Sequence, residues 1–337
     1  MNIVTTKYQP KNSDAWNELC LINNNLLQTT YYDDIRVLFN QYPVYFEVFD
    51  GNNLVGGVKA YEYRSNKLPF ISKISSTLRI IGEVIKAIDT ELPIEAINNN
   101  LIDYISHNNI TQFKSMGYYG GFENIALIHL KKKNTIVSPF DVAAFDLSEN
   151  KDVLWKKNKE SHKRNINKAL KASVNLIESD DLDHFITLLN ETYALQKKSA
   201  PNASFIKRIY NVLYPKGLLK IFFAEHNSIY YGSALVTQFG NYADYSFGGN
   251  LKNNFGAGHF LHWSIALTYQ QKNYSRYILG QVAKNDGNYG DNTKFVDGIS
   301  RFKREFSTFN LPSSSIEWTI NPLKLKTWQL IQKLAGL

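Results

Sequence analysis

The sequence predicts an α/β protein made of two similar domains, each a mixed, mostly antiparallel sheet flanked by helices. The chain has 337 residues, which exceeds the size at which one hydrophobic core usually stops growing. Two β-hairpin patterns occur at matching positions in the two halves. The second is followed by a strand, a glycine-bearing loop, a helix and another strand, which is typical of a βαβ-type unit.

The hairpins are the clearest elements. Both consist of two apolar runs around a polar turn, Asp50-Gly51-Asn52 in the first hairpin and His226-Asn227-Ser228 in the second. When Gly56 is aligned with Gly232, the two hairpins match without a gap. A duplicated domain explains this economically, and a chance match of two common hairpins is the alternative. The four expected strands span residues 44–49, 54–63, 218–224 and 229–239.

The other elements follow from hydrophobic periodicity and turn residues. In the second half we expect helices at 182–198, 205–213 and 259–272 and strands at 242–247 and 276–282. In the first half we expect a helix at 95–106 and a strand at 111–114, and 78–84 fits either type. The expected domains are 1–145 and 146–337, with the junction in 138–148 and no low-complexity linker.

Composition limits the class of protein. Hydrophobic residues make up 44% and charged residues 20% of the chain, and no apolar run approaches the roughly 18 residues of a membrane span. No secretory signal is visible, and the single cysteine, Cys20, fits a reducing compartment, so we expect a cytoplasmic protein. The net charge of +8 suits phosphorylated ligands, tRNA or an anionic membrane face. A solvated basic surface is the alternative.

The most basic stretch is residues 155–171. If it forms one helix, its cations lie on one stripe and its apolar side chains on another. The basic stripe holds Lys157, Arg164, Lys168 and Lys171, and the apolar stripe holds Trp155, His162, Ile166 and Ala169. Such a stripe can bind phosphates of a nucleotide, a lipid head group or tRNA. A solvated helix face is again the alternative.

A glycine loop, Asn253-x-x-Gly256-x-Gly258, separates a predicted strand from a predicted helix. Exposed backbone N–H groups at such a helix N-terminus can bind a pyrophosphate. We expect the backbone here to open into a cavity that reaches residues 301–303. A plain turn with capping glycines is the alternative.

Together these segments resemble a known family. Five of them, between Trp155 and Phe309, are similar in order and spacing to the C-terminal domain of the Fem peptidyltransferases: the basic stretch, Phe247-Gly248-Gly249, and residues 261–265, 277–281 and 298–306. The glycine loop resembles the one with which GNAT acyltransferases hold coenzyme A, with Asn253 in place of Gln or Arg.

The N-terminal half resembles the family less closely. The similar segments there are Leu26-Leu27-Gln28-Thr29, Val55-Gly56-Gly57 and Ile81-Gly82. Thr30-Tyr31-Tyr32 stands where the family usually has a Pro-x-Trp-like stretch, and Gly82-Glu83 replaces a Gly-Pro. These departures affect the expected acceptor pocket more than the fold.

The resemblance implies a tandem pair of GNAT-like domains that transfer an aminoacyl group from aminoacyl-tRNA to an amine of a peptidoglycan or other cell-envelope precursor. The precursor would be nucleotide- or lipid-linked, with peripheral contact to the inner membrane face. Related GNAT-like proteins use acyl-CoA. The residues implied are Lys303 and Tyr245 as catalytic, Phe302, Arg301, Tyr277, Gln28 and Arg164 as substrate-binding, and Asn253, Gly256, Ala257 and Gly258 as cofactor-binding.

The chemistry expected is attack of a free amine on an ester or thioester carbonyl held near residues 245–248. Backbone amides there, and Lys303, would stabilise the negative charge on the attacked carbonyl. Tyr245, Tyr277 or Tyr289 would protonate the leaving group. The loop at 283–296 is either a lid or a surface excursion.

Other kinds of site find less support. His259 and His262 lack a third ligand at a metal-binding spacing, so helix packing is the expected role of both. Two other functions stay open: an acyl-CoA-dependent GNAT N-acyltransferase acting on an amino sugar or small amine, and a non-catalytic binding module on the same scaffold.

Overall fold

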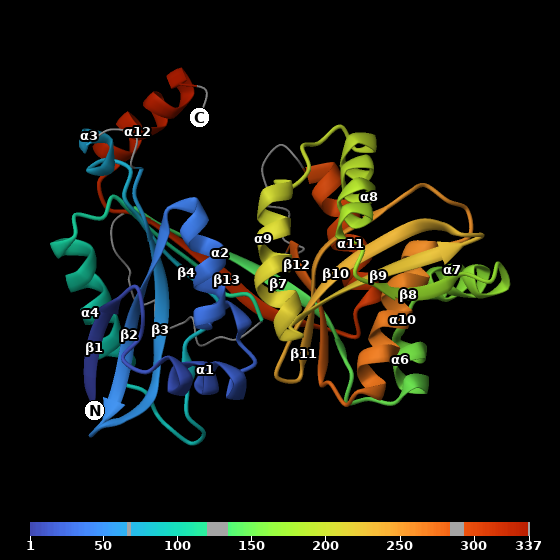
Figure 1. Cartoon of the computed structure of the whole chain (residues 1–337), viewed down its shortest axis with the longest axis horizontal. Coiled ribbons are helices and arrows are strands. Elements are labelled where there is room, and N and C mark those ends of the chain that lie inside the picture. The colour runs from blue at the N-terminus through green and yellow to red at the C-terminus, as the bar shows by residue number, and fades with distance from the viewer. Residues whose placement is uncertain (66–68, 120–133, 284–292, 336–337) are drawn as a thin grey trace. The chain divides into compact units, whose positions relative to one another are not determined.

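The computed structural model describes residues 1–65, 69–119, 134–283 and 293–335 (Figure 1). The chain forms two compact units, Met1–Phe140 with Pro312–Leu337, and Asp141–Leu311. It passes between the units within strand β7 (Thr135–Asp146) and again within β13 (Phe309–Thr319). The sequence-based boundary at 145 and 146 leaves the C-terminal segment in the second domain. In the structure this segment belongs to unit 1, because β13 pairs with β6 and adds Ile316 and Trp318 to the core of that unit.

Unit 1 contains a sheet in the order β1-β2-β3-β4-β6-β13, with β5 paired to β3. The β4–β6 pair is parallel, and the other pairs with a described register are antiparallel. Its strands are β1 (Asn2–Lys7), β2 (Gln41–Asp50), β3 (Asn53–Tyr63), β4 (Thr77–Ile81), β5 (Ile85–Lys86) and β6 (Gln112–Met116). Its helices are α1 (Ser13–Ile22), α2 (Asp33–Arg36), α3 (Pro69–Ser72), α4 (Ile94–His107) and α12 (Pro322–Ala335), with short helices η1 (Leu26–Gln28), η2 (Thr30–Tyr32) and η3 (Val37–Phe39).

Helices cover both faces of the unit 1 sheet. The apolar stripe of α4, including Ile97 and Leu101, packs with Phe46 and Val58 of the sheet. On the other face Trp16 of α1 is buried and meets the ring of Tyr45 edge-on at 5.0 Å. This two-sided burial explains why β2 and β3 read as nearly continuous apolar runs.

A buried ion pair fixes the helical segment that follows η1 to the sheet. The Nζ atom of Lys59, which is fully buried, lies 2.7 Å from Oδ1 of Asp33 and donates to the carbonyl of Thr29 at 2.5 Å. Tyr61 donates to the same carboxylate at 2.8 Å, and Tyr45 donates to its other oxygen. Burial lowers the pKa of Lys59, and the charge of Asp33 opposes this shift.

Unit 2 contains a sheet in the order β7-β12-β11-β10-β9-β8. Helices α10 and α7 lie on one face with α6, and α8 and α9 lie on the other (Figure 1). The strands are β8 (Asn175–Ser179), β9 (Leu219–His226), β10 (Ile229–Phe239), β11 (Tyr242–Asn250) and β12 (Arg276–Ala283). The helices are α6 (Lys151–Lys157), α7 (Glu160–Lys171), α8 (Leu182–Leu195), α9 (Ala203–Leu213), α10 (Ala257–Gln271) and α11 (Thr293–Phe306), with the short η5 (Tyr214–Lys216).

The two hairpins match in register as well as in sequence. Gly56 of β3 pairs with Val48, and Gly232 of β10 pairs with Ala224, eight residues earlier in each case. In each hairpin a bulge shifts the strand pairing just before this glycine. It lies directly before Gly56 in β3 and directly before Gly232 in β10. A shared register and a shared bulge support a duplicated unit, since bulges are specific features of a fold.

Several elements were not predicted from the sequence. The strands β1, β7, β8 and β13 and the helices α1 and α12 were not expected, whereas 78–84, which fitted either type, is mainly the strand β4. The basic stretch is two helices, because Asn158 leaves the helical region and its backbone N–H closes α6. Lys157 therefore does not share a helix with Arg164. In the described part of the chain, no helix combines the length and apolar character that crossing a membrane requires.

Candidate active site in the second unit

The sheet of unit 2 opens between β11 and β12. These parallel strands pair over three residues, from Tyr242 with Arg276 to Asp244 with Ile278. Beyond Asp244 the strands continue without a further pair between them in the described part of the chain. A bulge in the β10–β11 ladder shifts the register at Ser246. The opening lies at residues 245–248, where the sequence predicts that the carbonyl of the donor is held.

Lys303 of α11 reaches this opening. Its Nζ atom lies 6.0 Å from the ring centroid of Tyr245. A Cβ atom added to Gly280 would lie 3.2 Å from the same Nζ atom. Gly280 has φ of +95°, a conformation that favours glycine. Burial lowers the pKa of Lys303, and the charge of Asp244 partly opposes this. Lys303 makes no hydrogen bond or ion pair with any residue that the structure describes, so its ammonium is available to a ligand.

Two tyrosines and a histidine line the same region. A Cβ atom on Gly248 would lie 2.5 Å from the hydroxyl of Tyr245, so this glycine makes room for the phenol. The ring of Tyr245 meets His262 edge-on at 4.6 Å. The buried hydroxyl of Tyr277 is 2.9 Å from Nδ1 of His262. Burial raises the pKa of both tyrosines, so both phenols keep their protons.

A pocket of about 380 Å³ connects segments that are far apart in the sequence. The glycine loop, Phe302 of α11 and Asn165 of the basic helix α7 contribute to it. The expected cavity at the glycine loop is therefore present, and it reaches the Arg-Phe-Lys segment of α11. The lining is rich in carboxamides and comprises Asn165, Asn250, Leu251, Lys252, Asn253, Asn254, Gly256, Gly258, His259 and Phe302.

The glycine loop satisfies two of its own backbone donors. The Oδ1 atom of Asn253 accepts from the backbone N–H groups of Gly256 at 2.9 Å and Ala257 at 3.1 Å. A Cβ atom on Gly256 would lie 2.4 Å from the carbonyl oxygen of Asn165, and one on Gly258 would lie 2.8 Å from Oδ1 of Asn250. Both glycines are thus required for close packing. A pyrophosphate would have to replace the Asn253 carboxamide to reach these two donors.

The basic helix α7 presents exposed cations, and its Asn165 lines the pocket. On α7, His162, Ile166 and Ala169 are buried as predicted, whereas Arg164 is exposed. Lys168 and Lys171 are also exposed, and none of these three cations forms an ion pair with the described residues. This part of the predicted basic stripe is real, although it lacks Lys157.

Arg301 of α11 forms an ion pair within its own helix. Its guanidinium is exposed and donates to Glu305, one turn further along the helix, at 3.0 Å. Lys159, at the start of α7, donates to the same carboxylate at 2.7 Å. The hydrogen bonds from Lys159 and Arg301 hold the pKa of Glu305 at about 2. The Lys159–Glu305 pair therefore joins the start of α7 to α11.

A cluster of histidines underlies the site. The ring centroids of His162 and His259 are 5.0 Å apart, and Phe302 contacts both rings. Burial lowers the pKa of His259 to about 4 and that of His262 to about 3, with the charge of Lys303 adding to the second shift. Both are neutral at pH 7. In the described ranges, no group of three His, Cys, Asp or Glu side chains is placed to hold a metal ion.

Gln28, which the sequence analysis expects to bind substrate, is fully buried in unit 1. Its Nε2 donates to the carbonyls of Lys59 at 3.1 Å and Ile81 at 2.8 Å, and its Oε1 accepts from the Lys59 N–H at 2.6 Å. The carboxamide thus links β3 to β4, and in this structure it has no surface to offer a ligand.

Several residues beside Lys303 or in the lining of the glycine-loop pocket were not predicted from the sequence. Gly280, Asn165 and Asn250 carry no local signal, because their importance comes from what packs against them. His262 was visible only as a histidine on an apolar helix, which fits packing equally well. Tyr289 lies outside the described residues, as does much of the possible lid.

No known family model matches the chain, and no curated protein is similar to it in sequence. Solved structures are similar in fold. FemX has a TM-score of 0.75 at 14% identity, covering 98% of this chain and all of FemX. L-PGS from Bacillus licheniformis has 0.58 at 12% identity over 98% of both chains. A tandem GNAT protein from the clavulanic acid biosynthesis pathway has 0.50 at 11% identity, covering 95% of this chain and 99% of that one. The chain therefore has a FemX-like, tandem GNAT fold.

Proposed function

From this FemX-like fold, we propose that the chain is an acyltransferase that moves an aminoacyl group from aminoacyl-tRNA to an amine of a cell-envelope precursor. The observation that carries the proposal is the Lys303 ammonium, which is partly buried where β11 and β12 part and makes no ion pair with a described residue. A desolvated charge in an opening is expensive to keep and is typical of a functional site.

In the proposed reaction the acceptor amine attacks the ester carbonyl of the donor, and a C–N bond forms. The carbonyl oxygen becomes an oxyanion beside the Lys303 ammonium, which neutralises the developing charge. The C–O bond to the tRNA ribose then breaks. Because the interaction is stronger with the oxyanion than with the neutral carbonyl, it stabilises the transition state more than the ground state.

Tyr245 is proposed to carry the proton between the two reacting groups. Its phenol gives its proton to the departing ribose oxygen and recovers one from the ammonium formed on the acceptor nitrogen, so protons balance. Its hydroxyl beside Gly248 and its ring close to Lys303 support this assignment. Tyr277 is fully buried and bonded to His262, and we assign it to holding that ring in place.

Two features favour tRNA over coenzyme A as donor. The carboxamide of Asn253 already binds the loop N–H groups that a pyrophosphate would use. The exposed Arg164, Lys168 and Lys171 form no ion pair with the described residues and offer their charges to a polyanion. The pocket beside Phe302, lined by carboxamides, suits a polar acceptor such as a glycan or peptide.

The decisive experiment is a transfer assay with radiolabelled aminoacyl-tRNA or acyl-CoA and a panel of amine acceptors, including peptidoglycan precursors. We expect product from aminoacyl-tRNA that depends on Lys303. Product only from acyl-CoA would move the chain to the CoA-dependent GNAT class, acting on an amino sugar or small amine. Nucleic-acid or precursor binding without transfer from either donor would identify a non-catalytic binding module and overturn the proposal.

A further inference from the structure

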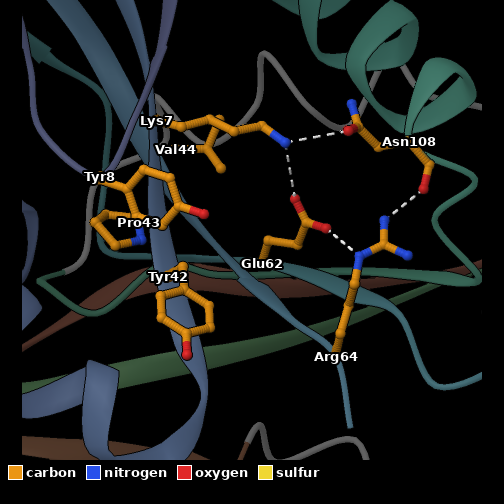
Figure 2. Close-up of a pocket in the computed structure, with 8 residues that line it drawn as sticks. All are labelled: Lys7, Tyr8, Tyr42, Pro43, Val44, Glu62, Arg64 and Asn108. Atoms are coloured by element: carbon orange, nitrogen blue, oxygen red, sulfur yellow. Dashed lines mark hydrogen bonds and ion pairs between the residues drawn. The ribbon is translucent and has the colours of Figure 1, made fainter. Parts of the chain in front are cut away.

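Unit 1 contains a pocket of about 400 Å³ that the proposed reaction does not use (Figure 2). It lies at the ends of β1 and β3, the start of β2 and the end of α4, and its volume falls in the range of about 300–1,000 Å³ found for small-molecule sites. Its lining residues are Lys7, Tyr8, Tyr42, Pro43, Val44, Glu62, Arg64 and Asn108.

A hydrogen-bonded carboxylate fixes the cations of this pocket. Glu62 accepts from Arg64 and lies 3.6 Å from Nζ of Lys7 (Figure 2). It also accepts from Tyr104. Burial raises the pKa of Glu62, but hydrogen bonds from Tyr104 and Arg64 and the charges of Arg64 and Lys7 bring it below its ordinary value. The group therefore carries two positive charges and one negative charge, so the pocket has a net positive charge.

Lys7 is the cation with spare hydrogen-bonding capacity. Its ammonium donates to Oδ1 of Asn108 at 3.1 Å, and its side chain is 44% exposed. An ammonium has three N–H donors. If one points to Asn108 and one to Glu62, the third can donate to a ligand. Arg64 is more fully occupied, since it bonds Glu62 and also donates to the backbone carbonyl of Asn108 at 2.5 Å.

Tyr8 projects an aromatic ring beside this cation at the cost of backbone strain. It has φ of +73°, which is unfavourable for a bulky side chain. Its N–H donates to the carbonyl of Pro43 at 2.9 Å, and its ring meets that of Tyr42 edge-on with centroids 5.9 Å apart. Tyr8 is 67% exposed, so burial of the ring does not compensate for the strain. Strained residues of this kind cluster at ligand sites.

We propose that this pocket binds a nucleotide. The flat ring of a base would stack on the exposed Tyr8–Tyr42 pair, and a phosphate would accept from the free donor of Lys7. Neither element alone explains the site, since a bare anion would not use the tyrosines and a neutral ring would not use the cation. The nucleotide can belong to a free nucleoside phosphate or to single-stranded RNA.

The test is calorimetric titration of the full chain with AMP, adenosine, inorganic phosphate and a hexamer of oligoadenylate. We expect AMP to bind at least tenfold more tightly than adenosine or phosphate, because only AMP engages both parts of the pocket. Tighter binding of the hexamer per site would identify RNA as the source, and equal binding would identify the free nucleotide. No saturable AMP or hexamer binding at millimolar concentration would overturn the proposal.

Two variants and two controls separate binding from folding. Tyr8→Asn and Lys7→Gln should each weaken AMP binding at least tenfold, whereas Tyr214→Ala and Lys216→Gln, exposed positions in unit 2, should not. Because asparagine tolerates a left-handed backbone, Tyr8→Asn should not lower the melting temperature. A lower melting temperature with unchanged AMP affinity would give Tyr8 a purely structural role and refute the site.

Discussion

Replacement of Lys303 by methionine should separate catalysis from stability. Methionine is apolar and unbranched, so it can follow the path of the lysine stem while removing the ammonium. Loss of one donor to an oxyanion costs about 100- to 1,000-fold in kcat, or about 2.7–4 kcal/mol in the barrier. The protein should at the same time become more stable, by about 1 kcal/mol, because the native state no longer buries a charge that bonds to no described residue.

The pH dependence has a defined sign. Burial puts the pKa of Lys303 in the native state below its ordinary value of 10.5. The oxyanion needs the protonated form, so kcat/KM should fall as pH rises through the lowered pKa. Between the two pKa values the unfolded chain binds more protons than the native one, so stability rises with pH across this window. Lys303→Met should remove that rise.

The assay combines single-turnover transfer from aminoacyl-tRNA with urea unfolding between pH 6 and pH 10. Lys216→Met, an exposed lysine in the same unit, is the matched control and should change neither measurement. The reasoning would be refuted if Lys303→Met kept full activity, or if it lost activity together with several kcal/mol of stability, since the lysine would then serve folding.

Three further predictions follow from the packing. Gly280→Ala should reduce transfer at least tenfold and cost about 1 kcal/mol in urea unfolding, because its Cβ would approach the lysine ammonium to 3.2 Å at a positive φ; an unchanged rate would place that ammonium outside the chemistry. In unit 1, Asp33→Ala should cost about 3–5 kcal/mol of unfolding free energy by leaving Lys59 buried without its counter-ion, and the double variant with Lys59→Met should recover most of it; no recovery would assign the loss to packing. The Arg164→Gln/Lys168→Gln double variant should lower the salt dependence of tRNA binding by about 1.4–1.8 in log–log slope, measured by filter binding, and an unchanged slope would exclude this face of α7.

The sequence allowed much of the fold to be predicted because the hairpin strands are locally encoded. The runs at 44–49 and 218–224 are apolar on both faces, and their turns have strong local signals. β13 was missed because Pro312 and three serines interrupt its pattern, and it is only partly buried. The basic stretch was read as one helix because Asn158 and Lys159 are tolerated in helices, whereas both have an extended backbone in the structure.

The candidate site shows the same division. The resemblance to the Fem family singled out Lys303 and Phe302, and the glycine loop also has a local signal because it lies between a strand and a helix. The family resemblance assigned Gln28 to substrate binding. In the structure the Gln28 carboxamide donates to backbone carbonyls of two strands instead. A buried amide and an exposed amide look the same in a sequence.

By itself the sequence determined the duplicated hairpins, the order of elements in the second half and the segments that carry the family resemblance, because these depend on periodicity and turn residues within short windows. Only the tertiary structure decided that β11 and β12 part after Asp244 and that Lys303 enters the opening without an ion pair to a described residue. It also decided that the Asn253 side chain accepts from the backbone of its own loop. Desolvation and hydrogen-bond satisfaction depend on neighbours from distant parts of the chain, and a linear pattern does not specify them.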